Sequence, residues 1–253
     1  MTASKVLGSK VPQITVLFWI VKVLTTGMGE TTSDFFVFSI DPVVAVLVAF
    51  VVFAAVLTVQ FAVRRYIPWI YWLAVAMVSV FGTMAADVTH IVLGVPYIVS
   101  TAVFAVVLAA VFIAWYRVEH TLSIHSITTR RREVFYWAAV LVTFALGTAT
   151  GDLTATTLHL GYLASGVLFA LVIAIPAVAF RWFRLNAVVA FWFAYIVTRP
   201  LGASFADWMG VSTARGGLAW GTGPVSLALA AIIIVLVAVL TVRWRGTRQL
   251  ELS

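Results

Sequence analysis

Eight long apolar segments run through the sequence, and short stretches that contain most of the charged residues separate them. Each segment has about 20 residues, the length that a helix needs to cross roughly 30 Å of hydrocarbon at about 1.5 Å per residue. The expected spans are 12–33, 42–63, 67–89, 96–116, 134–156, 160–180, 187–209 and 223–243. The pattern therefore predicts an all-α, polytopic membrane protein. Its single transmembrane domain is expected over 11–243, with a loop at 118–133 between the two halves.

Composition supports this prediction and limits the partners. The chain is 63% hydrophobic and 10% charged, so it has more apolar surface than a soluble domain buries. Cysteine is absent, which excludes disulfide frameworks and thiolate metal sites. The net charge of +7 comes from basic residues between apolar segments, not from a basic patch with interleaved aromatic residues. The lipid bilayer is therefore an expected partner and nucleic acid is not.

The basic residues between the spans predict the orientation. Those expected on one side are Lys5, Lys10, Arg64, Arg65, Arg117, Arg130, Arg131, Arg132, Arg181, Arg184, Arg243, Arg245 and Arg248. The loops on the opposite side contain only Arg215. Positively charged loops stay in the cytoplasm, so both termini are expected there. The N-terminal stretch lacks the pattern of a cleaved signal peptide and is expected to be retained.

One motif occurs four times on the odd-numbered spans. A tryptophan that follows Phe or Tyr is followed ten residues later by glycine and fifteen residues later by aspartate. The tryptophans are Trp19, Trp72, Trp137 and Trp192, the glycines are Gly29, Gly82, Gly147 and Gly202, and the aspartates are Asp34, Asp87, Asp152 and Asp207. Two spans per unit make every copy enter from the same side, so the chain is predicted to contain four tandem, parallel helical-hairpin repeats. They cover approximately 11–65, 66–117, 130–184 and 186–243.

Positions 0, 4, 7, 11 and 15 residues after each repeat tryptophan fall on one helical face. Besides the four aspartates, this face carries the polar residues Thr26, Glu30, Ser79, Thr83, Thr148 and Arg199. A charge deep in lipid costs at least about 2.5–3.5 kcal/mol, so the face is expected to surround a central axis. The apolar even-numbered spans are expected to screen it from lipid. The repeat glycines are expected to let helix backbones approach closely or to loosen the helix.

The repeat resembles a bacterial membrane family known mainly as a tandem repeat of unknown function, with two transmembrane segments and a tryptophan in each of four copies. The resemblance is carried by FW at 18–19, YW at 71–72, YW at 136–137 and FW at 191–192, with the glycine and aspartate that follow each pair. It covers nearly the whole chain. It implies this architecture and a place in the bacterial plasma (inner) membrane, but no defined activity.

Three charged residues and one proline distinguish the repeats from one another. Glu30 and Arg199 lie about one turn apart in depth, and two interpretations stay open: a structural ion pair, or a gate that uses the same two residues. Pro200 is expected to kink the seventh span. For Lys22, the alternatives are snorkelling to the membrane interface and pairing with a carboxylate of the polar face, in a charge-compensating or gating role.

Two alternatives also stay open for the other motif residues. The four aspartates either form a cation-attracting vestibule or act as interfacial and capping residues. His90 and His159 follow motif aspartates, so they are either weak candidates for metal ligands, suited to manganese or zinc, or loop residues. The repeat aromatics are either interface anchors and packing wedges or a ligand cage.

The polar face favours transport of a small cation, either a divalent metal such as manganese or a proton-coupled ion, as substrate. In this hypothesis the four aspartates gather the ion and Glu30 binds it more deeply. The alternatives are a membrane scaffold or sensor that transports nothing, and an intramembrane enzyme or protein that binds a small molecule or haem. The sequence contains no phosphate-binding loop, HExxH motif or nucleophile elbow, so an enzyme is not expected.

Overall fold

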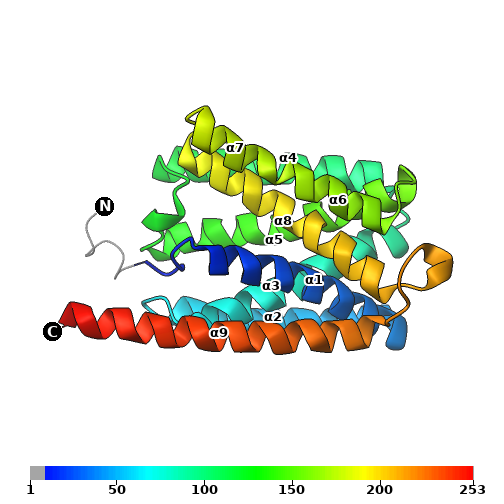
Figure 1. Ribbon diagram of the computed structural model, residues 1–253, viewed down its shortest axis with the longest axis horizontal. Coiled ribbons are helices and arrows are strands. Elements are labelled where there is room, and N and C mark those ends of the chain that lie inside the picture. Colours follow the sequence, from blue (N-terminus) through cyan, green and yellow to red (C-terminus); the bar gives the residue numbers. More distant parts are fainter. Residues whose placement is uncertain (1–8, 253) are drawn as a thin grey trace.

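The structure, a computed structural model, describes residues 9–252 as an elongated bundle of helices with no strand among those residues (Figure 1). The α-helices are α1 (Val16–Ser39), α2 (Pro42–Ala62), α3 (Pro68–Ile91), α4 (Tyr97–Glu119), α5 (Arg130–Asp152), α6 (Tyr162–Val172), α7 (Ala174–Trp182), α8 (Ala187–Gly210) and α9 (Thr222–Leu252). Three short turns are η2 (Ile124–Ser126), the π-helical η3 (Leu153–Thr157) and η4 (Thr213–Arg215). Residues 9 and 252 lie at one end of the bundle, called here the terminal end; the opposite end is called the acidic end.

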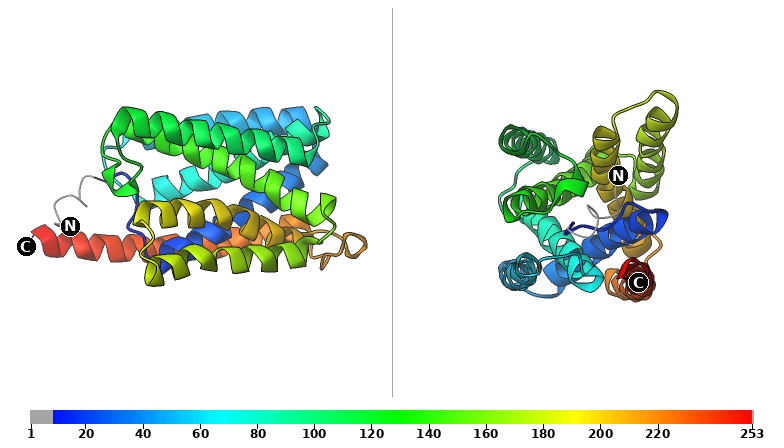
Figure 2. Two further views of the ribbon diagram at one scale, coloured as in Figure 1. Left: turned by 90° about the horizontal axis from the view of Figure 1, so that it is seen from above. Right: turned by 90° about the vertical axis from the view of Figure 1, so that its left-hand side faces the viewer.

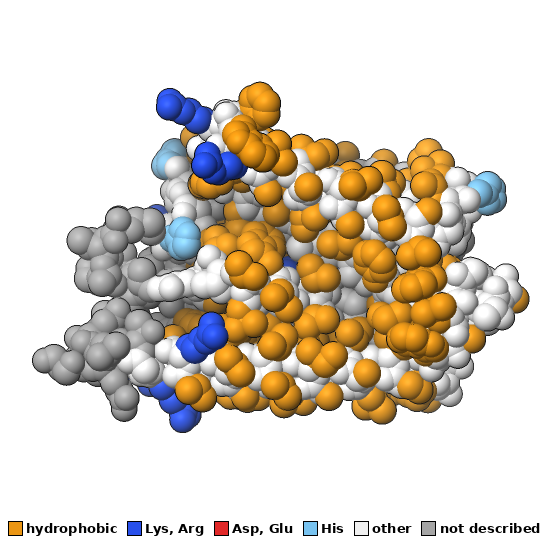
Figure 3. All heavy atoms as spheres, viewed as in Figure 1, with side chains coloured by type: hydrophobic (Ala, Val, Ile, Leu, Met, Phe, Trp, Pro, Cys, Tyr) orange, Lys and Arg blue, Asp and Glu red, His pale blue; other side chains and the backbone are white. Residues whose placement is uncertain are grey.

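The described residues form seven segments long and apolar enough to cross a membrane, so the chain is an integral membrane protein. They include the continuous α5–η3 and α6–α7 segments. The 24-residue α1 is as long as the others but carries Lys22, Glu30 and Asp34, so its composition alone does not identify it as a span. Hydrophobic side chains cover the middle of the surface, while Lys and Arg gather near the terminal end (Figure 3).

The helix bounds agree with the expected spans to within about four residues, with three differences. Helix α1 ends at Ser39, six residues beyond the expected span, the helix that begins at Thr222 continues to Leu252, and the sixth span is divided at Ile173 into α6 and α7. Helix α8 runs through Pro200 without interruption, so the kink expected at this residue stays a prediction. Pro176 in α7 removes a backbone donor next to the division at Ile173. Lys5 and the side chain of Arg248 lie outside the described residues.

Four helices that carry the repeat motif surround a central axis. These motif helices, α1, α3, α5 and α8, each contact two neighbours, and α8 closes the ring against α1 (Figure 2). The remaining helices lie outside and are called outer helices. Each packs chiefly against the motif helix of the following repeat: α2 on α3, α4 on α5, α6 with α7 on α8, and α9 on α1. Every repeat therefore depends on its neighbour for cover.

The repeat glycines lie where neighbouring motif helices cross. Each faces the residue seven positions after the tryptophan of the next repeat: Gly29 faces Ser79, Gly82 faces Phe144, Gly147 faces Arg199, and Gly202 faces Thr26. A Cβ atom added to any of the four would overlap its neighbour. The expectation that these glycines allow close approach is therefore confirmed, and the last crossing closes the ring.

Aromatic side chains form a second set of contacts from each repeat to the next, nearer the terminal end. The residue before each tryptophan contacts the tryptophan of the next repeat: Phe18 with Trp72, Tyr71 with Trp137, Tyr136 with Trp192, and Phe191 with Trp19. The ring centroids are 5.6–6.2 Å apart. We call these eight residues the aromatic ring. Trp72, Trp137 and Trp192 are buried, so they pack the bundle rather than anchor it at an interface.

Residues 9–15, called the terminal segment, close the ring at the terminal end. The Lys10 amide donates to the carbonyl of Ile127 at 3.0 Å, and the Tyr66 amide donates to the carbonyl of Ser9 at 3.1 Å. The Lys10 side chain forms a buried ion pair with Glu133, whose other oxygen accepts from the Gln60 amide at 2.9 Å. Lys10 was expected as a loop charge and is instead part of the packed interior.

Candidate functional site

A small cavity lies on the axis at the acidic end of the motif helices. Its volume is about 60 Å³. The acidic residues that line it are Glu30, Asp34, Asp87, Asp152 and Asp207. Val37, Phe38, Ile91, Tyr97, Tyr162 and Arg215 complete the lining. The structure thus brings one aspartate from each repeat to a common site, as their shared position in the motif predicts, and we call it the acidic cavity.

The aspartates have few compensating partners. None of the four forms an ion pair with another described residue. Asp87 accepts a hydrogen bond from the Ser33 hydroxyl at 2.9 Å. Asp207 is only 6% exposed, and its Oδ1 atom has no hydrogen-bond partner among the described residues. A buried oxygen without a donor is costly, so this atom is available to a proton or a bound cation.

Arg199 of the fourth repeat lies next to the acidic cavity and contacts the other three repeats. Its Nη2 atom forms an ion pair with Glu30 and donates to the hydroxyls of Thr83 and Thr148, the latter at 2.6 Å. All three partners lie eleven residues after their repeat tryptophan, so they share one depth. The expected Glu30–Arg199 ion pair is confirmed. The hydroxyls of Thr83 and Thr148 accept from the guanidinium, and each also donates to a carbonyl of its own helix.

Lys22 is buried on the axis, on the side of Arg199 nearer the terminal end. The residue is 1% exposed, and its amine has no hydrogen-bond partner among the described residues. The Nζ atom lies 4.2 Å from the ring centre of Phe144 and 4.3 Å from that of Tyr195, which are cation–π distances. Neither interpretation from the sequence holds: Lys22 does not snorkel, and no carboxylate of the described residues pairs with it.

The position of Lys22 also corrects the predicted polar face. The residues three positions after each tryptophan, Lys22, Val75, Val140 and Tyr195, are all fully buried. Those four positions after it, Val23, Ala76, Leu141 and Ile196, are half-buried. The axis near the aromatic ring is therefore lined by the first set, because the motif helices slant across one another and the buried face shifts along each helix (Figure 1).

The hydroxyls of Thr26 and Ser79, expected on an ion pathway, instead lie at helix crossings. Thr26 Oγ1 donates to the carbonyl of Thr198 at 3.1 Å, and Ser79 Oγ donates to that of Thr25 at 3.0 Å. Both side chains join neighbouring motif helices at the repeat glycines. Neither lines the acidic cavity.

The two histidines do not join the aspartates. His90 Nδ1 lies 2.7 Å from the carbonyl of Val95, and its ring stacks on Tyr97 with a centroid separation of 3.6 Å. His159 is exposed, with a positive φ of 56°. Among the side chains that the structure describes, those of residues 9–246, no three His, Asp or Glu side chains are close enough together to hold a metal ion as they stand.

Four residues of the site escaped the sequence analysis. Ser33 bonds Asp87, while Tyr97, Tyr162 and Arg215 line the cavity. Arg215 donates to the Tyr162 hydroxyl at 2.5 Å. The two tyrosines have a detectable signal, because each follows its repeat tryptophan by 25 residues. The sequence shows Arg215 only as the one basic residue in the loops of the non-cytoplasmic side.

The fold and the site define a class of membrane protein: four tandem repeats whose motif helices close into a ring around an axis that has an acidic cavity at one end. The chain matches the family model described as Repeat of Unknown Function (DUF347) at residues 17–66, 70–121, 135–186 and 190–245, and it belongs to that family. The resemblance seen in the sequence is thereby confirmed. No curated protein and no solved structure matches the chain.

Proposed function

We propose that this protein transports a small inorganic cation across the membrane in exchange for protons and binds both at the acidic cavity. The observation that carries the proposal is the gathering of five carboxyl groups around one cavity of about 60 Å³, four of them without an ion pair. Carboxyl groups at such a site cannot all be ionised unless a bound cation compensates their charges, and without a cation some of them must hold protons. Replacement of the protons by the cation, and of the cation by protons, is the property that a coupled carrier needs.

The size of the acidic cavity supports an inorganic substrate. A water molecule needs about 10–15 Å³ of such volume, so the cavity accommodates a small ion with a few waters. Sites for organic ligands usually have roughly 300–1,000 Å³. A larger apolar cavity does exist, but it lies outside the ring between α1, α7 and α8, and not on the axis.

In this proposal Glu30 is the residue that links ion binding to movement. Its carboxylate either pairs with Arg199 or binds a cation in the acidic cavity. Releasing Arg199 leaves a buried guanidinium uncompensated, which costs several kcal/mol unless the helices rearrange. Because Glu30 is on α1 and Arg199 is on α8, the exchange of partners acts on the interface that closes the ring.

In this proposal the structure corresponds to a carrier state in which the axis is closed toward the terminal end. The aromatic ring, Lys22 and the terminal segment fill the axis between Arg199 and the terminal end. With both termini in the cytoplasm of a bacterial cell, as the basic residues predict, the acidic cavity faces outward. A divalent ion such as Mn²⁺ would draw the carboxyl groups closer than they now stand. A monovalent ion would need fewer of them.

The test is an ion-flux assay in proteoliposomes with a pH dye inside. Mn²⁺, Zn²⁺, Ca²⁺, Mg²⁺ and Na⁺ are added outside one at a time, and flux of at least one ion is expected with release of protons. Asp207→Asn is expected to reduce that flux at least tenfold. Asp41→Asn is the matched control, because Asp41 is exposed, does not line the acidic cavity, and caps α2 by accepting hydrogen bonds from the amides of Val43 and Val44.

Two results would contradict the proposal. One is an unchanged ion flux after the four motif aspartates are all replaced by asparagine in a folded protein. The other is a folded wild-type protein that moves neither ions nor protons. The second result would favour a scaffold or sensor, for which the tight glycine crossings and the filled axis are sufficient.

A further inference from the structure

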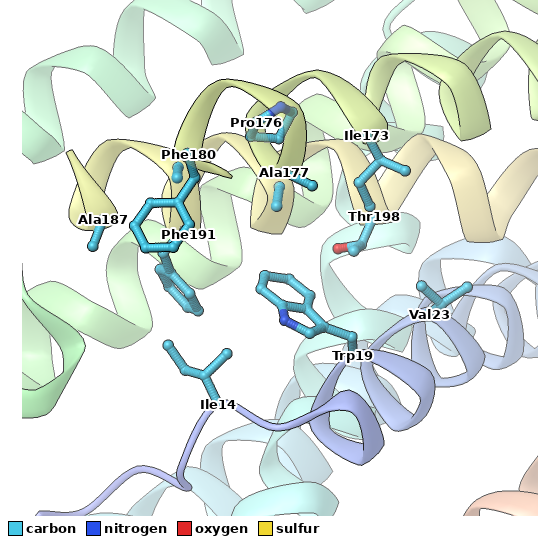
Figure 4. Close-up of a pocket in the computed structure, with 12 residues that line it drawn as sticks. Ile14, Trp19, Val23, Ile173, Pro176, Ala177, Phe180, Ala187, Phe191 and Thr198 are labelled. Atoms are coloured by element: carbon cyan, nitrogen blue, oxygen red, sulfur yellow. The ribbon is translucent and has the colours of Figure 1, made fainter. Parts of the chain in front are cut away.

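An apolar groove breaks the fourfold pattern on the outside of the bundle. It has a volume of about 530 Å³ and lies between α1, α7 and the start of α8. Figure 4 shows Ile14, Trp19 and Val23 of the N-terminal part on one side and Pro176, Ala177 and Phe180 on the other, with open space between them. The groove is on the membrane-spanning part of the molecule and toward its terminal end.

The same position is filled where another repeat tryptophan meets an outer helix. Trp192 of the fourth repeat packs against α4 of the second repeat. Its ring centroid lies 4.9 Å from that of Phe112 and 5.8 Å from that of Trp115, which is fully buried. The equivalent contact one repeat further round the ring is that of Trp19 with α7. The contact of Trp192 with Phe112 and Trp115, called here the filled seam, is therefore an internal reference for the groove.

The sequence explains why the groove stays open. Phe112 and Trp115 lie 40 and 43 residues after Trp72, and the corresponding positions after Trp137 are Ala177 and Phe180. Alanine cannot fill the place of a phenyl ring, and Phe180 is 53% exposed where Trp115 is buried. Pro176 and the division between α6 and α7 set the outer helix apart here.

The chemistry of the groove specifies its occupant. Apart from the indole nitrogen of Trp19, its main polar group is the Thr198 hydroxyl, which donates to the carbonyl of Tyr195 at 2.6 Å and is therefore satisfied. A polar ligand would lose its hydrogen bonds with water on entry. A hydrocarbon chain loses no hydrogen bonds on entry, and the bilayer provides such chains beside the groove. The lining therefore fits one acyl chain.

Two basic residues favour an anionic lipid. Arg181 directly follows Phe180, and Arg184 lies three residues before Ala187, which also lines the groove. Both are exposed, and neither forms an ion pair with another described residue. Guanidinium groups bind phosphate oxygens by charge-assisted hydrogen bonds. We propose that the groove binds one anionic phospholipid, with an acyl chain between Trp19 and Ala177 and the headgroup phosphate at Arg181 and Arg184.

The experiment uses phosphatidylglycerol with a photoreactive diazirine in one acyl chain, and the phosphatidylcholine analogue for comparison. The full-length protein is labelled in mixed micelles and the labelled residues are mapped by mass spectrometry. Labels are expected on the peptides that contain Trp19 and Ala177. Ala177→Phe, which copies the filled seam, is expected to reduce this labelling about tenfold. Ala174→Phe on the same helix, exposed and outside the groove, is expected to leave it unchanged.

A second measurement does not depend on those variants. The fluorescence of Trp19, taken as the difference between the wild-type protein and Trp19→Phe, is expected to be quenched by phosphatidylglycerol with brominated chains. Replacing Arg181 and Arg184 by glutamine is expected to weaken the preference for phosphatidylglycerol by about fivefold for each arginine.

Four results would overturn the lipid site. Two concern the labelling pattern: labelling as strong in Ala177→Phe as in the wild-type protein, and labelling spread evenly over the exposed surface. Equal labelling by phosphatidylglycerol and phosphatidylcholine would remove the headgroup site. Absence of lipid label at Trp19 and Ala177 in a protein that is dimeric in the same micelles would show that the groove is a protein interface instead.

Discussion

Lys22 and Arg199 place two basic side chains on the axis, and only Arg199 has an acidic partner there. The energies involved differ in size. Leaving a buried polar group without a hydrogen bond costs about 1–3 kcal/mol, or more if it is charged, whereas a cation–π contact returns about 0.5–2 kcal/mol. Lys22 is therefore expected to destabilise the fold.

Lys22→Val is expected to raise the free energy of unfolding by about 1 kcal/mol, because Val75 and Val140 occupy the same position in two other repeats. Thermal unfolding in detergent measures the change. Lys10→Val is the contrasting variant, since it breaks the buried pair with Glu133 and is expected to cost about 3–5 kcal/mol. A Lys22→Val protein that melts well below the wild type would contradict this account of the amine.

Glu30→Gln is expected to lower the free energy of unfolding by about 3–5 kcal/mol, because it leaves the Arg199 guanidinium without its counter-ion. The double variant Glu30→Gln with Arg199→Gln is expected to lose less than the sum of the two single variants. Denaturant unfolding of all four proteins gives the coupling energy. Additive effects would mean that the two side chains do not interact.

At the scale of the helices, the glycine crossings determine the packing. Gly147 and Gly151 lie one turn apart on α5, but only Gly147 is at a crossing. An added Cβ at Gly147 would overlap Arg199, whereas at Gly151 it would stand 3.9 Å from Pro200, which is ordinary contact. The pair therefore offers a comparison within one helix.

Gly147→Ala is expected to cost about 1–3 kcal/mol through overpacking and to disturb the Glu30–Arg199 pair. Gly151→Ala is expected to be neutral or to stabilise by up to about 1 kcal/mol, because alanine favours the helix. Melting temperatures in one detergent decide between them. Similar losses at both positions would show that α5 and α8 do not approach at Gly147.

The sequence could predict what depends on local pattern. The spans, the repeat and the common site of Asp34, Asp87, Asp152 and Asp207 follow from hydrophobicity and spacing. It could not predict that α2 packs on α3 or α9 on α1, because a hairpin motif does not specify which neighbour an outer helix covers. It also misplaced Lys22, since one residue of drift on a slanting helix turns a side chain by about 100°.

At the scale of the whole molecule, the ring predicts a set of distances. Val16, Trp69, Val134 and Val189 each lie three residues before their repeat tryptophan, and all four are exposed. The chain has no cysteine, so spin labels can be placed on pairs of introduced cysteines without removing others. These positions mark the corners of the ring at the terminal end.

Electron–electron distance measurements are expected to give four similar distances between labels on adjacent repeats, including 16 with 189, and longer ones for 16 with 134 and 69 with 189. The reason is that α8 returns to α1. If the repeats instead formed an open row, the distance between 16 and 189 would be the longest of all.

The ion pair that closes the ring joins residues 169 positions apart in the chain. At roughly 5–20 residues per second, a ribosome needs about 10–30 s after Glu30 to deliver Arg199. Throughout that time α1 has neither its partner from α8 nor its cover from α9, yet it carries Lys22, Glu30 and Asp34. Newly made α1 is therefore expected to be screened from lipid by something other than this chain until the last repeat is complete.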